Sequence, residues 1–327
     1  MSGIKSLDAQ QVRRIVMERC RGAGGPTDLT VEGPISRSSV SNVFVGSGDI
    51  FPVPVAIKLF FTPPSGAVAR KAARTYYDAL CELHASTASD AEFSVVEPLA
   101  IIEEYGIVIT EWIVGLTFAE WVMRSSPAEA TEGLRKAGIW LARLHWATGI
   151  SCAPMDTEPA LQRLLLSMTA HPSIARSKLV QRTSKLLRRT ARRLGVEEVV
   201  WCRSHGDFKP ANLVVRDGRL FGIDLDLAYF TPTVHDAAHF LNHLQLLFPR
   251  LGGPAQVSAL IAAFREGYAE DGRMALPSLP LAWERLRNAV HLLLRHCEWT
   301  YPPRRWVGGL LLCWLVRDLG QDLARFF

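Results

Sequence analysis

The chain has 327 residues, and 48% of them are hydrophobic, so it can bury a large core and is expected to form two lobes rather than one. Its formal net charge of +5 permits anionic partners without requiring nucleic acid. The six cysteines are scattered without a CxxC pair, which favours reduced thiols in a cytoplasmic protein over a disulfide framework.

Targeting and membrane signals are weak at both ends of the sequence. The first residues, MSGIKSLDAQQVRR, lack the apolar segment of a signal peptide. The most apolar late run, residues 306–316, is shorter than the about 20 residues that a membrane-spanning helix needs. We therefore expect no transmembrane segment and interpret this run as a buried helix.

The first third of the chain predicts a small β-rich lobe. Apolar residues at helical spacing predict a helix over residues 8–20. Runs rich in Val, Ile and Phe predict strands over 29–35, 42–48 and 53–61, and again on both sides of a turn within 92–112. A longer helix is expected over 67–84.

Helices dominate from residue 115 onward, most clearly over 131–147 and 177–195. The exception is a hairpin over 212–225, with Asp217 and Gly218 at its turn. The expected architecture is therefore α+β: a small antiparallel β N-lobe with one long helix over residues 1–114, and a large mainly α C-lobe over 115–327.

The stretch SHGDFKPANLVV, residues 204–215, places an acid, a cation and an amide directly before a strand. The hairpin should bring Asn212 close to Asp224, with Asp207 on the preceding loop. Three oxygen-bearing side chains of this kind suit Mg²⁺ with phosphate completing its shell, although each alone is an ordinary turn residue. The order H-G-D-x-x-x-x-N followed by I-D matches that of kinases, in which the Asp accepts a hydroxyl proton.

This order resembles the aminoglycoside phosphotransferase and choline kinase family, whose HGD replaces the HRD of protein kinases. The resemblance implies a bilobal protein-kinase-like fold that binds Mg²⁺ and ATP, or alternatively GTP, between its lobes. It also implies a catalytic base at Asp207 and metal ligands at Asn212 and Asp224. His205 would support the catalytic loop, and Asp236 in VHDAAHF would hold that loop from behind.

The nucleotide-binding residues follow from the same resemblance. VAIKLF places Lys58 where the family's lysine contacts the α- and β-phosphates. ITEWIVG resembles the hinge, where backbone groups of Glu111 and Ile113 would meet the nucleotide base. Ser38 and Ser39 stand where the phosphate loop often has glycine; their backbone amides and hydroxyls can cradle phosphate, or the loop is a plain polar turn.

The acid that pairs with Lys58 in kinases is not assigned by the sequence. Alignment places Tyr76 at that position, and Asp78 and Glu82 are nearby alternatives on other helix faces.

Lys209 leaves the acceptor class open, because DFKPAN resembles the D-x-K-P-x-N of Ser/Thr protein kinases, whose lysine reaches the transferred phosphoryl group. The short stretch from Asp224 to Asp236 opposes a protein kinase, since it leaves no room for an activation segment. Gly206 replaces the Arg that would read a phosphorylated segment, so constitutive activity is expected. The preferred reading is transfer of the γ-phosphate to a hydroxyl of a small molecule, such as an antibiotic, a sugar or an amino alcohol. A protein kinase and a catalytically silent scaffold remain the alternatives.

The helix over residues 176–194 is strongly basic and contains no acid. A solvated face is the usual meaning of such a run, and contact with an anionic membrane or nucleic acid is the alternative; nucleic acid is not expected as a partner. By resemblance the run falls in the acceptor-binding insert, which favours a neutral or anionic acceptor over a polycationic one. The basic residues are Arg176, Lys178, Arg182, Lys185, Arg188, Arg189, Arg192 and Arg193.

Two further clusters remain outside this assignment. His235, His239 and His243 share one helix face and are interpreted as buried or hydrogen-bonded histidines rather than a metal site. TYPPRRW, residues 300–306, forms a basic aromatic cluster that suits either a sugar or phosphate site or a helix junction.

Overall fold

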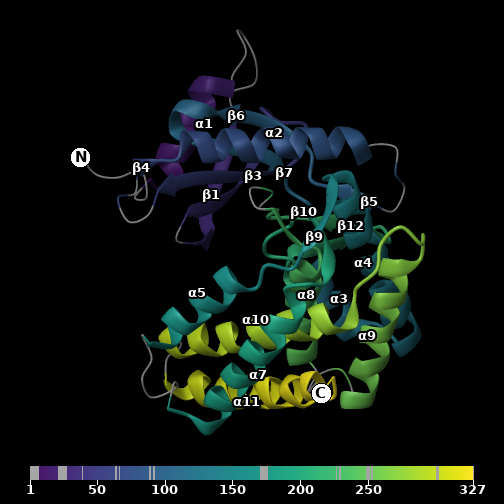
Figure 1. The fold of residues 1–327 in the computed structure, drawn as a ribbon. Helices are drawn as coiled ribbons and strands as arrows, with labels where there is room; N and C mark the ends of the chain where they lie inside the picture. The colour runs from purple at the N-terminus through teal and green to yellow at the C-terminus, as the bar shows by residue number, and fades with distance from the viewer. Residues whose placement is uncertain are drawn as a thin grey trace. The chain divides into compact units, whose positions relative to one another are not determined.

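The computed structural model describes residues 7–20, 28–38, 40–62, 65, 67–87, 90, 93–169, 176–225, 227, 230–247, 251, 253–299 and 302–326 (Figure 1). The chain divides into two compact units. The first comprises Met1–Gly115 with Val214–Ile223, and the second comprises Leu116–Leu213 with Asp224–Phe327.

The first unit is built on an antiparallel sheet of order β1-β2-β3-β7-β6, with the short strand β4 paired to β3. The strands are β1 (Leu29–Arg37), β2 (Ser41–Gly48), β3 (Val55–Thr62), β4 (Ala67–Val68), β6 (Pro98–Ile102) and β7 (Ile107–Glu111), and η2 (Glu103–Tyr105) joins the last two. The expected strands and the turn near residue 105 are therefore confirmed.

Two helices cover the sheet of the first unit: α1 (Ala9–Cys20) and α2 (Arg70–Thr87). Side chains on a strand alternate between the two faces of a sheet. Ile57 of β3 accordingly packs into the same cluster as Val12 and Val16 of α1. Phe60 of β3 instead packs with Ala73 of α2. The two sheet faces thus bury different hydrophobic clusters.

The hairpin expected over 212–225 consists of β11 (Leu213–Arg216) and β12 (Arg219–Gly222), joined by a turn in which Asp217 and Gly218 have positive φ. β12 pairs in parallel with β5 (Phe93–Val95). Because β5 belongs to the first unit, residues 214–223 fall within that unit, although the sequence analysis placed them in the C-lobe.

The second unit is mainly helical, as expected. Its helices are α3 (Phe118–Arg124), α4 (Pro127–Ala147), α5 (Glu158–Thr169), α7 (Lys178–Leu194), α8 (Val234–Leu246), α9 (Pro254–Ala269), α10 (Ser278–Trp299) and α11 (Pro302–Ala324). The helices α10 and α11 run beside one another (Figure 1). Capping boxes of Thr117 with Glu120 and of Ser126 with Glu129 fix where α3 and α4 begin. Two short elements, β8 (Leu116–Thr117) and η3 (Pro210–Asn212), complete the connections.

A three-stranded antiparallel sheet in the second unit was missed by the sequence analysis. It has the order β13-β10-β9 and comprises β9 (Ile150–Pro154), β10 (Glu198–Arg203) and β13 (Phe230–Pro232). Four of the five residues of β9 are exposed, so the strand shows no alternation of buried and exposed residues.

The helix expected over residues 306–316 is present, but the expectation that it is buried holds only in part. This run belongs to α11, where Leu312, Leu315 and Val316 are buried but Leu310 is 68% exposed. Apolar residues extend around more of this helix than the neighbouring elements cover. Leu310 therefore stays exposed while the face with Leu312, Leu315 and Val316 packs inward. No described helix combines the length and the apolar character that crossing a membrane requires.

Two glycines bring α4 and α9 into backbone contact. A Cβ atom added to Gly138 would lie 2.1 Å from the carbonyl oxygen of Phe264, and one added to Gly267 would lie 2.0 Å from that of Arg135. Both distances are far below van der Waals contact, so these positions exclude any side chain while the helices keep their spacing.

We expect Gly138→Ala to lower the free energy of unfolding by about 1–3 kcal/mol, because the added methyl group must push the two helices apart. The matched control is Gly320→Ala in α11, where an added Cβ meets nothing within 4 Å. There the better helix propensity of alanine should stabilise the protein by up to about 1 kcal/mol. Urea unfolding of both variants measures the difference, and equal effects would contradict a tight contact at Gly138.

Candidate active site

The loop 204–209 is fixed by the buried carboxylate of Asp236 in α8, which is 1% exposed. Its Oδ2 accepts a hydrogen bond from the backbone N–H of His205 at 2.7 Å, and its Oδ1 accepts one from that of Gly206 at 3.0 Å. The Nε2 atom of His145 lies 3.1 Å from Oδ2. Gly206 has φ of 82°, a conformation that only glycine adopts without strain. The sequence H-G-D therefore meets a backbone requirement of the loop.

The charge on Asp236 is stabilised by these partners. Burial on its own raises the pKa of this carboxyl, but the hydrogen bond and the charge of His145 outweigh it and lower the pKa to about 2. Asp236 therefore stays ionised in the interior and keeps both backbone amides of the loop in place.

Aromatic side chains support the same loop from inside the second unit. Phe208 stacks on Trp140 with ring centroids 5.6 Å apart and on Phe240 of α8 at 4.8 Å. His205 is fully buried against Trp140 and Phe208, and burial lowers its pKa. Neither of its ring nitrogens has a hydrogen-bond partner among the described residues. His205 thus acts within the loop as a neutral packed ring.

The carboxylate of Asp207 is the centre of a polar cluster. Its Oδ2 accepts hydrogen bonds from Lys209 Nζ at 2.5 Å and from Asn212 Nδ2 at 3.0 Å. Asn212 Nδ2 also donates to the backbone oxygen of Asp207 at 2.9 Å. On the other oxygen, Oδ1, the Nε2 atom of His239 lies 3.5 Å away. Three residues that the sequence singled out, Asp207, Lys209 and Asn212, are therefore in direct contact.

His239 is a residue of this cluster that the sequence analysis did not connect with Asp207. Its ring stacks on His243 with centroids 4.7 Å apart. Burial lowers the pKa of His239 to about 3 and that of His243 to about 4, so both rings are neutral near pH 7. The sequence spacing could have indicated this contact. His239 lies one helical turn after Asp236 and therefore on the helix face that holds the loop.

The third histidine of that face has different surroundings. His235 Nδ1 lies 2.7 Å from Glu284 Oε1; burial on its own lowers the pKa of His235, but this hydrogen bond raises it overall. Within the described residues, no three His, Cys, Asp or Glu side chains form a group that could hold a metal ion.

Asn212 and Asp224 are separated by the β11–β12 hairpin. Asn212 ends η3 and is buried, whereas Asp224 follows β12 by two residues and is exposed. Asp224 has φ of 57°, a left-handed conformation that few residues other than glycine adopt. Such outliers gather at functional sites. The amide oxygen of Asn212 and the carboxylate of Asp224 are ligands of the type that Mg²⁺ prefers.

In the first unit, Lys58 lies at the centre of the sheet, opposite Val43 of β2 and Val108 of β7. Its Nζ atom lies 4.8 Å from the ring centroid of Tyr76 and 5.1 Å from that of Phe60. Tyr76 thus occupies the neighbourhood in which kinases place an acid, and its ring offers a cation–π contact. Asp78 instead lies 3.6 Å from Arg74.

The other nucleotide-binding candidates also belong to the first unit. Ser38 Oγ accepts a hydrogen bond from the backbone N–H of Ser41 at 2.9 Å, which closes the β1–β2 turn. Ser39 lies outside the described residues. The backbone N–H of Glu111 donates to Glu97 O, and its carboxylate pairs with Arg216 at 2.7 Å, while Ile113 is buried. The side chains of residues 300–306, which hold the TYPPRRW cluster, also lie outside the described part.

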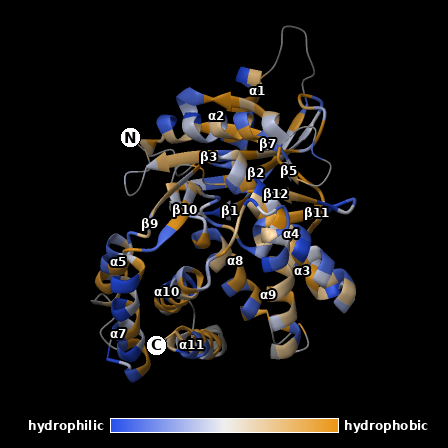
Figure 2. Cartoon of the chain, turned by 45° about the vertical axis from the view of Figure 1, so that its right-hand side comes forward, coloured by the Kyte–Doolittle hydropathy of each residue, from blue (hydrophilic) through white to orange (hydrophobic). Residues whose placement is uncertain are grey.

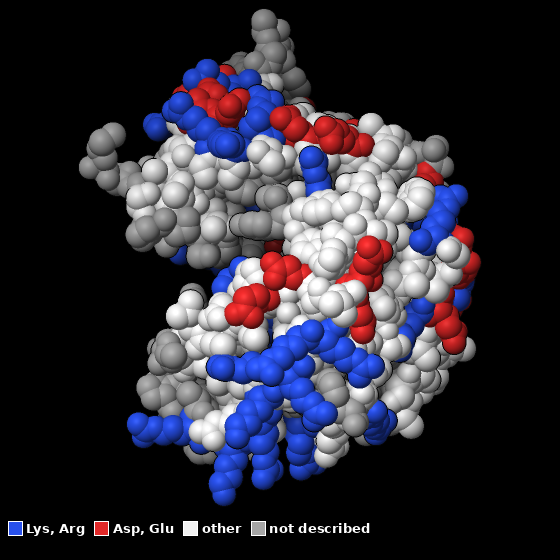
Figure 3. Space-filling view, in the orientation of Figure 1, with Lys and Arg blue, Asp and Glu red and all other residues white. Residues whose placement is uncertain are grey.

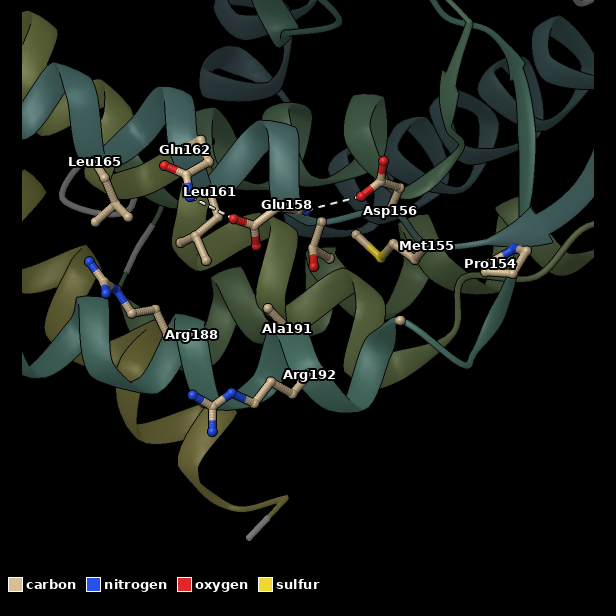
Figure 4. A pocket seen from close by; sticks show the side chains of 12 residues that line it. Pro154, Met155, Asp156, Glu158, Leu161, Gln162, Leu165, Arg188, Ala191 and Arg192 are labelled. Atoms are coloured by element: carbon tan, nitrogen blue, oxygen red, sulfur yellow. Dashed lines mark hydrogen bonds between the residues drawn. The ribbon is translucent and has the colours of Figure 1, made fainter.

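A cavity of about 550 Å³ lies in the second unit between α5 and α7 (Figure 4). Leu161 and Leu165 line it from α5, and Arg188 and Arg192 line it from α7. None of the site residues predicted from the sequence lines this cavity.

The class of protein follows from a comparison with known families. The model of the phosphotransferase enzyme family matches residues 34–276, so the chain belongs to this family. No curated protein matches the chain at a significant level.

Solved structures agree on a protein-kinase-like fold. A glucosamine kinase in complex with glucosamine, ADP and inorganic phosphate is 14% identical, with a TM-score of 0.70 over 98% of this chain and 88% of the other. The aminoglycoside phosphotransferase APH(4)-Ia, a thermostable mutant, is 12% identical, with a TM-score of 0.57 over 95% and 98% of the two chains. A choline/ethanolamine kinase family protein from Mesorhizobium loti is 15% identical, with a TM-score of 0.57 over 97% and 98%.

We expect Asp236→Asn to destabilise the protein by on the order of 2 kcal/mol at about pH 7, because the lowered pKa of the native carboxyl measures its preference for the ionised state. The pKa falls from an ordinary 3.8 to about 2 on folding. The stabilisation by the ionised carboxylate is complete at a pH above 3.8, the pKa in the unfolded chain. It is lost as the pH falls through about 2, the pKa in the folded protein. The difference between wild type and variant in urea unfolding should therefore shrink from about pH 7 to about pH 3.

The matched control for this experiment is Asp217→Asn, which removes an exposed carboxylate from the β11–β12 turn. It should change stability little at either pH. A gap between wild type and Asp236→Asn that is independent of pH would contradict the role of the charge.

Proposed function

We propose that the protein transfers the γ-phosphate of ATP, or of GTP, to a hydroxyl group of a small molecule such as an antibiotic, a sugar or an amino alcohol. The observation that carries this proposal is the Asp207 carboxylate, which contacts Lys209, Asn212 and His239 on a loop pinned by Asp236. Family membership supports phosphotransfer. The glucosamine kinase neighbour, solved with an amino sugar and ADP, supports a nucleotide donor and a hydroxylated acceptor.

Asp207 is assigned the role of base. Its Oδ2 already accepts two hydrogen bonds, so Oδ1 is the atom to which the acceptor hydroxyl would donate. The carboxylate orients the hydroxyl for attack and takes its proton as the bond to phosphorus forms. Lys209 places a positive charge beside this carboxylate, where it can offset negative charge on the transferred phosphoryl oxygens.

Mg²⁺ would be held by Asn212 and Asp224, and it would neutralise charge on the phosphate oxygens. Lys58 would contact the α- and β-phosphates. Ser38 and Ser39 would lie at the phosphates, and backbone groups of Glu111 and Ile113 at the base. We assign a neutral or anionic acceptor, because the insert helix α7 carries seven basic residues and no acid. A polycationic acceptor would be repelled there.

Asp207→Asn should lower turnover roughly 100-fold or more, because the amide cannot take the hydroxyl proton. The measurement is ATP consumption with Mg²⁺ across a panel of metabolites and antibiotics, followed by kinetics with the accepted compound. The control is Asp217→Asn at the exposed hairpin turn, which should keep full activity. Full activity of Asp207→Asn would refute the assignment.

Two further measurements test the alternatives of a protein kinase and a silent scaffold. Label transfer to generic protein substrates, without turnover of any small molecule, would favour a protein kinase. Absence of a melting shift with Mg·ATP and with Mg·GTP would favour a silent scaffold, because a ligand that binds the native state raises its melting temperature.

His239→Leu should reduce kcat roughly tenfold and leave KM nearly unchanged, because the Asp207 carboxylate loses a neighbour that orients it rather than one that binds substrate. His239→Gln should recover most of the activity, since its amide nitrogen can reach the place of Nε2. His243→Leu is the control, because it removes the stacked ring without removing the group next to Asp207. Equal losses in His239→Gln and His239→Leu would show that only packing matters.

A further inference from the structure

The exposed face of α7 is a continuous basic stripe. Seven of its 17 residues are Lys or Arg, and all seven are exposed. They recur at spacings of three and four residues, which places them on one side of the helix over about 22 Å. Figure 3 shows Lys and Arg side chains gathered over this helix, and Figure 2 shows α7 as mainly hydrophilic. The stripe consists of Lys178, Arg182, Lys185, Arg188, Arg189, Arg192 and Arg193.

Arg193 is tied into the fold, since its Nη1 donates to the backbone oxygen of Phe326 at 3.1 Å, but most of this face is not needed for packing. α7 is attached by its opposite side, where Val180, Leu187 and Leu194 are buried, and Trp283 Nε1 donates to the backbone oxygen of Leu187 at 3.1 Å. Neighbouring like charges on a helix repel. Most of the stripe has no acidic partner within the described chain to relieve this repulsion; these residues are Lys178, Arg182, Lys185, Arg188 and Arg192. The stripe therefore has the properties of a contact surface for an external anion.

Apolar side chains are exposed beside the stripe. Val196, two residues beyond the end of α7, is 82% exposed, and Leu166 of α5 is 67% exposed. The cavity between α5 and α7 lies near Val196 and Leu166, because their chain neighbours Gly195 and Leu165 line it. Arg188 of the stripe lines the same cavity (Figure 4). Exposed aliphatic residues and basic residues thus lie near the same cavity.

We propose that this face binds the surface of a membrane that contains anionic phospholipids. The basic residues of α7 lie at the headgroup phosphates, and Val196 and Leu166 enter the boundary between headgroups and acyl chains. An exposed aliphatic side chain gains nothing against a solvated phosphodiester backbone, so the combination favours lipid over nucleic acid. The contact is peripheral, because the apolar face of α7 itself stays buried in the protein. None of its residues belongs to the Asp207 cluster, so vesicle binding can be measured apart from phosphate transfer, although the charge of α7 also underlies the acceptor class assigned above.

Sedimentation of the full-length protein with vesicles tests this proposal. The protein should bind vesicles of phosphatidylcholine with about 30% phosphatidylglycerol, and not vesicles of phosphatidylcholine alone. Raising NaCl from about 0.1 M to about 0.5 M should weaken binding, because exposed charges are screened. The variant Arg182→Gln/Lys185→Gln should bind at least about tenfold more weakly.

The matched control is Arg70→Gln/Lys71→Gln, which removes two exposed charges from the start of α2 and should bind like wild type. Val196→Ser should also weaken binding, whereas Ile150→Ser, at another exposed apolar residue, should not. Melting temperatures verify that every variant is folded.

Three results would overturn the proposal. One is equal binding to neutral and anionic vesicles. Another is an equal loss in the α2 and α7 double variants, which would make net charge rather than the stripe responsible. The third is tighter binding to a short RNA or DNA duplex than to the anionic vesicles at the same salt concentration, which would assign the stripe to nucleic acid.

Discussion

The candidate site depends on one interaction, the acceptance of two consecutive backbone N–H groups by the buried carboxylate of Asp236. Two consecutive amides that donate to one carboxylate fix the path of the backbone at residues 205 and 206. They therefore also fix the position from which the side chain of Asp207 projects. The ionised form of the Asp236 carboxylate is stabilised by His145, which also forms a hydrogen bond with Tyr268 of α9. The proposed base Asp207, held in this way, would need no reorganisation when the reaction begins. The cost is a buried ionised group, which the interior tolerates only while all its partners are present.

The electrostatics around Asp207 are simpler than the number of polar groups implies. Of the three side chains in the described part of the chain that contact its carboxylate, Asn212 is neutral by nature, and His239 is neutral because burial lowers its pKa. Lys209 is the contact that carries charge. The site therefore combines a strong attraction from one cation with weaker orienting contacts from neutral groups.

Much of this arrangement could be predicted from the sequence, for identifiable reasons. Periodicity located the strands of the first unit and the main helices, and Asp217-Gly218 marked the hairpin turn. The spacing from Asp207 to Asn212 placed both on one short loop, where contact is nearly forced. Other features depend on tertiary packing. The sheet of β9, β10 and β13 joins short strands from distant segments, and nothing local marks β9. His239 could be linked to Asp207 only indirectly, through its place one helical turn after Asp236, and the contact itself depends on how α8 packs against the loop. The exposure of Leu310 likewise depends on which side of α11 its neighbours cover.

The backbone contact at Gly138 and Gly267 also constrains how this protein can evolve. Every substitution at either position enlarges the side chain, so both codons should tolerate only synonymous change while α4 and α9 keep their spacing. Drift in this part of the second unit is then confined to outward-facing residues, and libraries aimed at a new acceptor would waste diversity at these two positions. The backbone contact between α4 and α9 should therefore stay constant during evolution, while the surface residues around it can change.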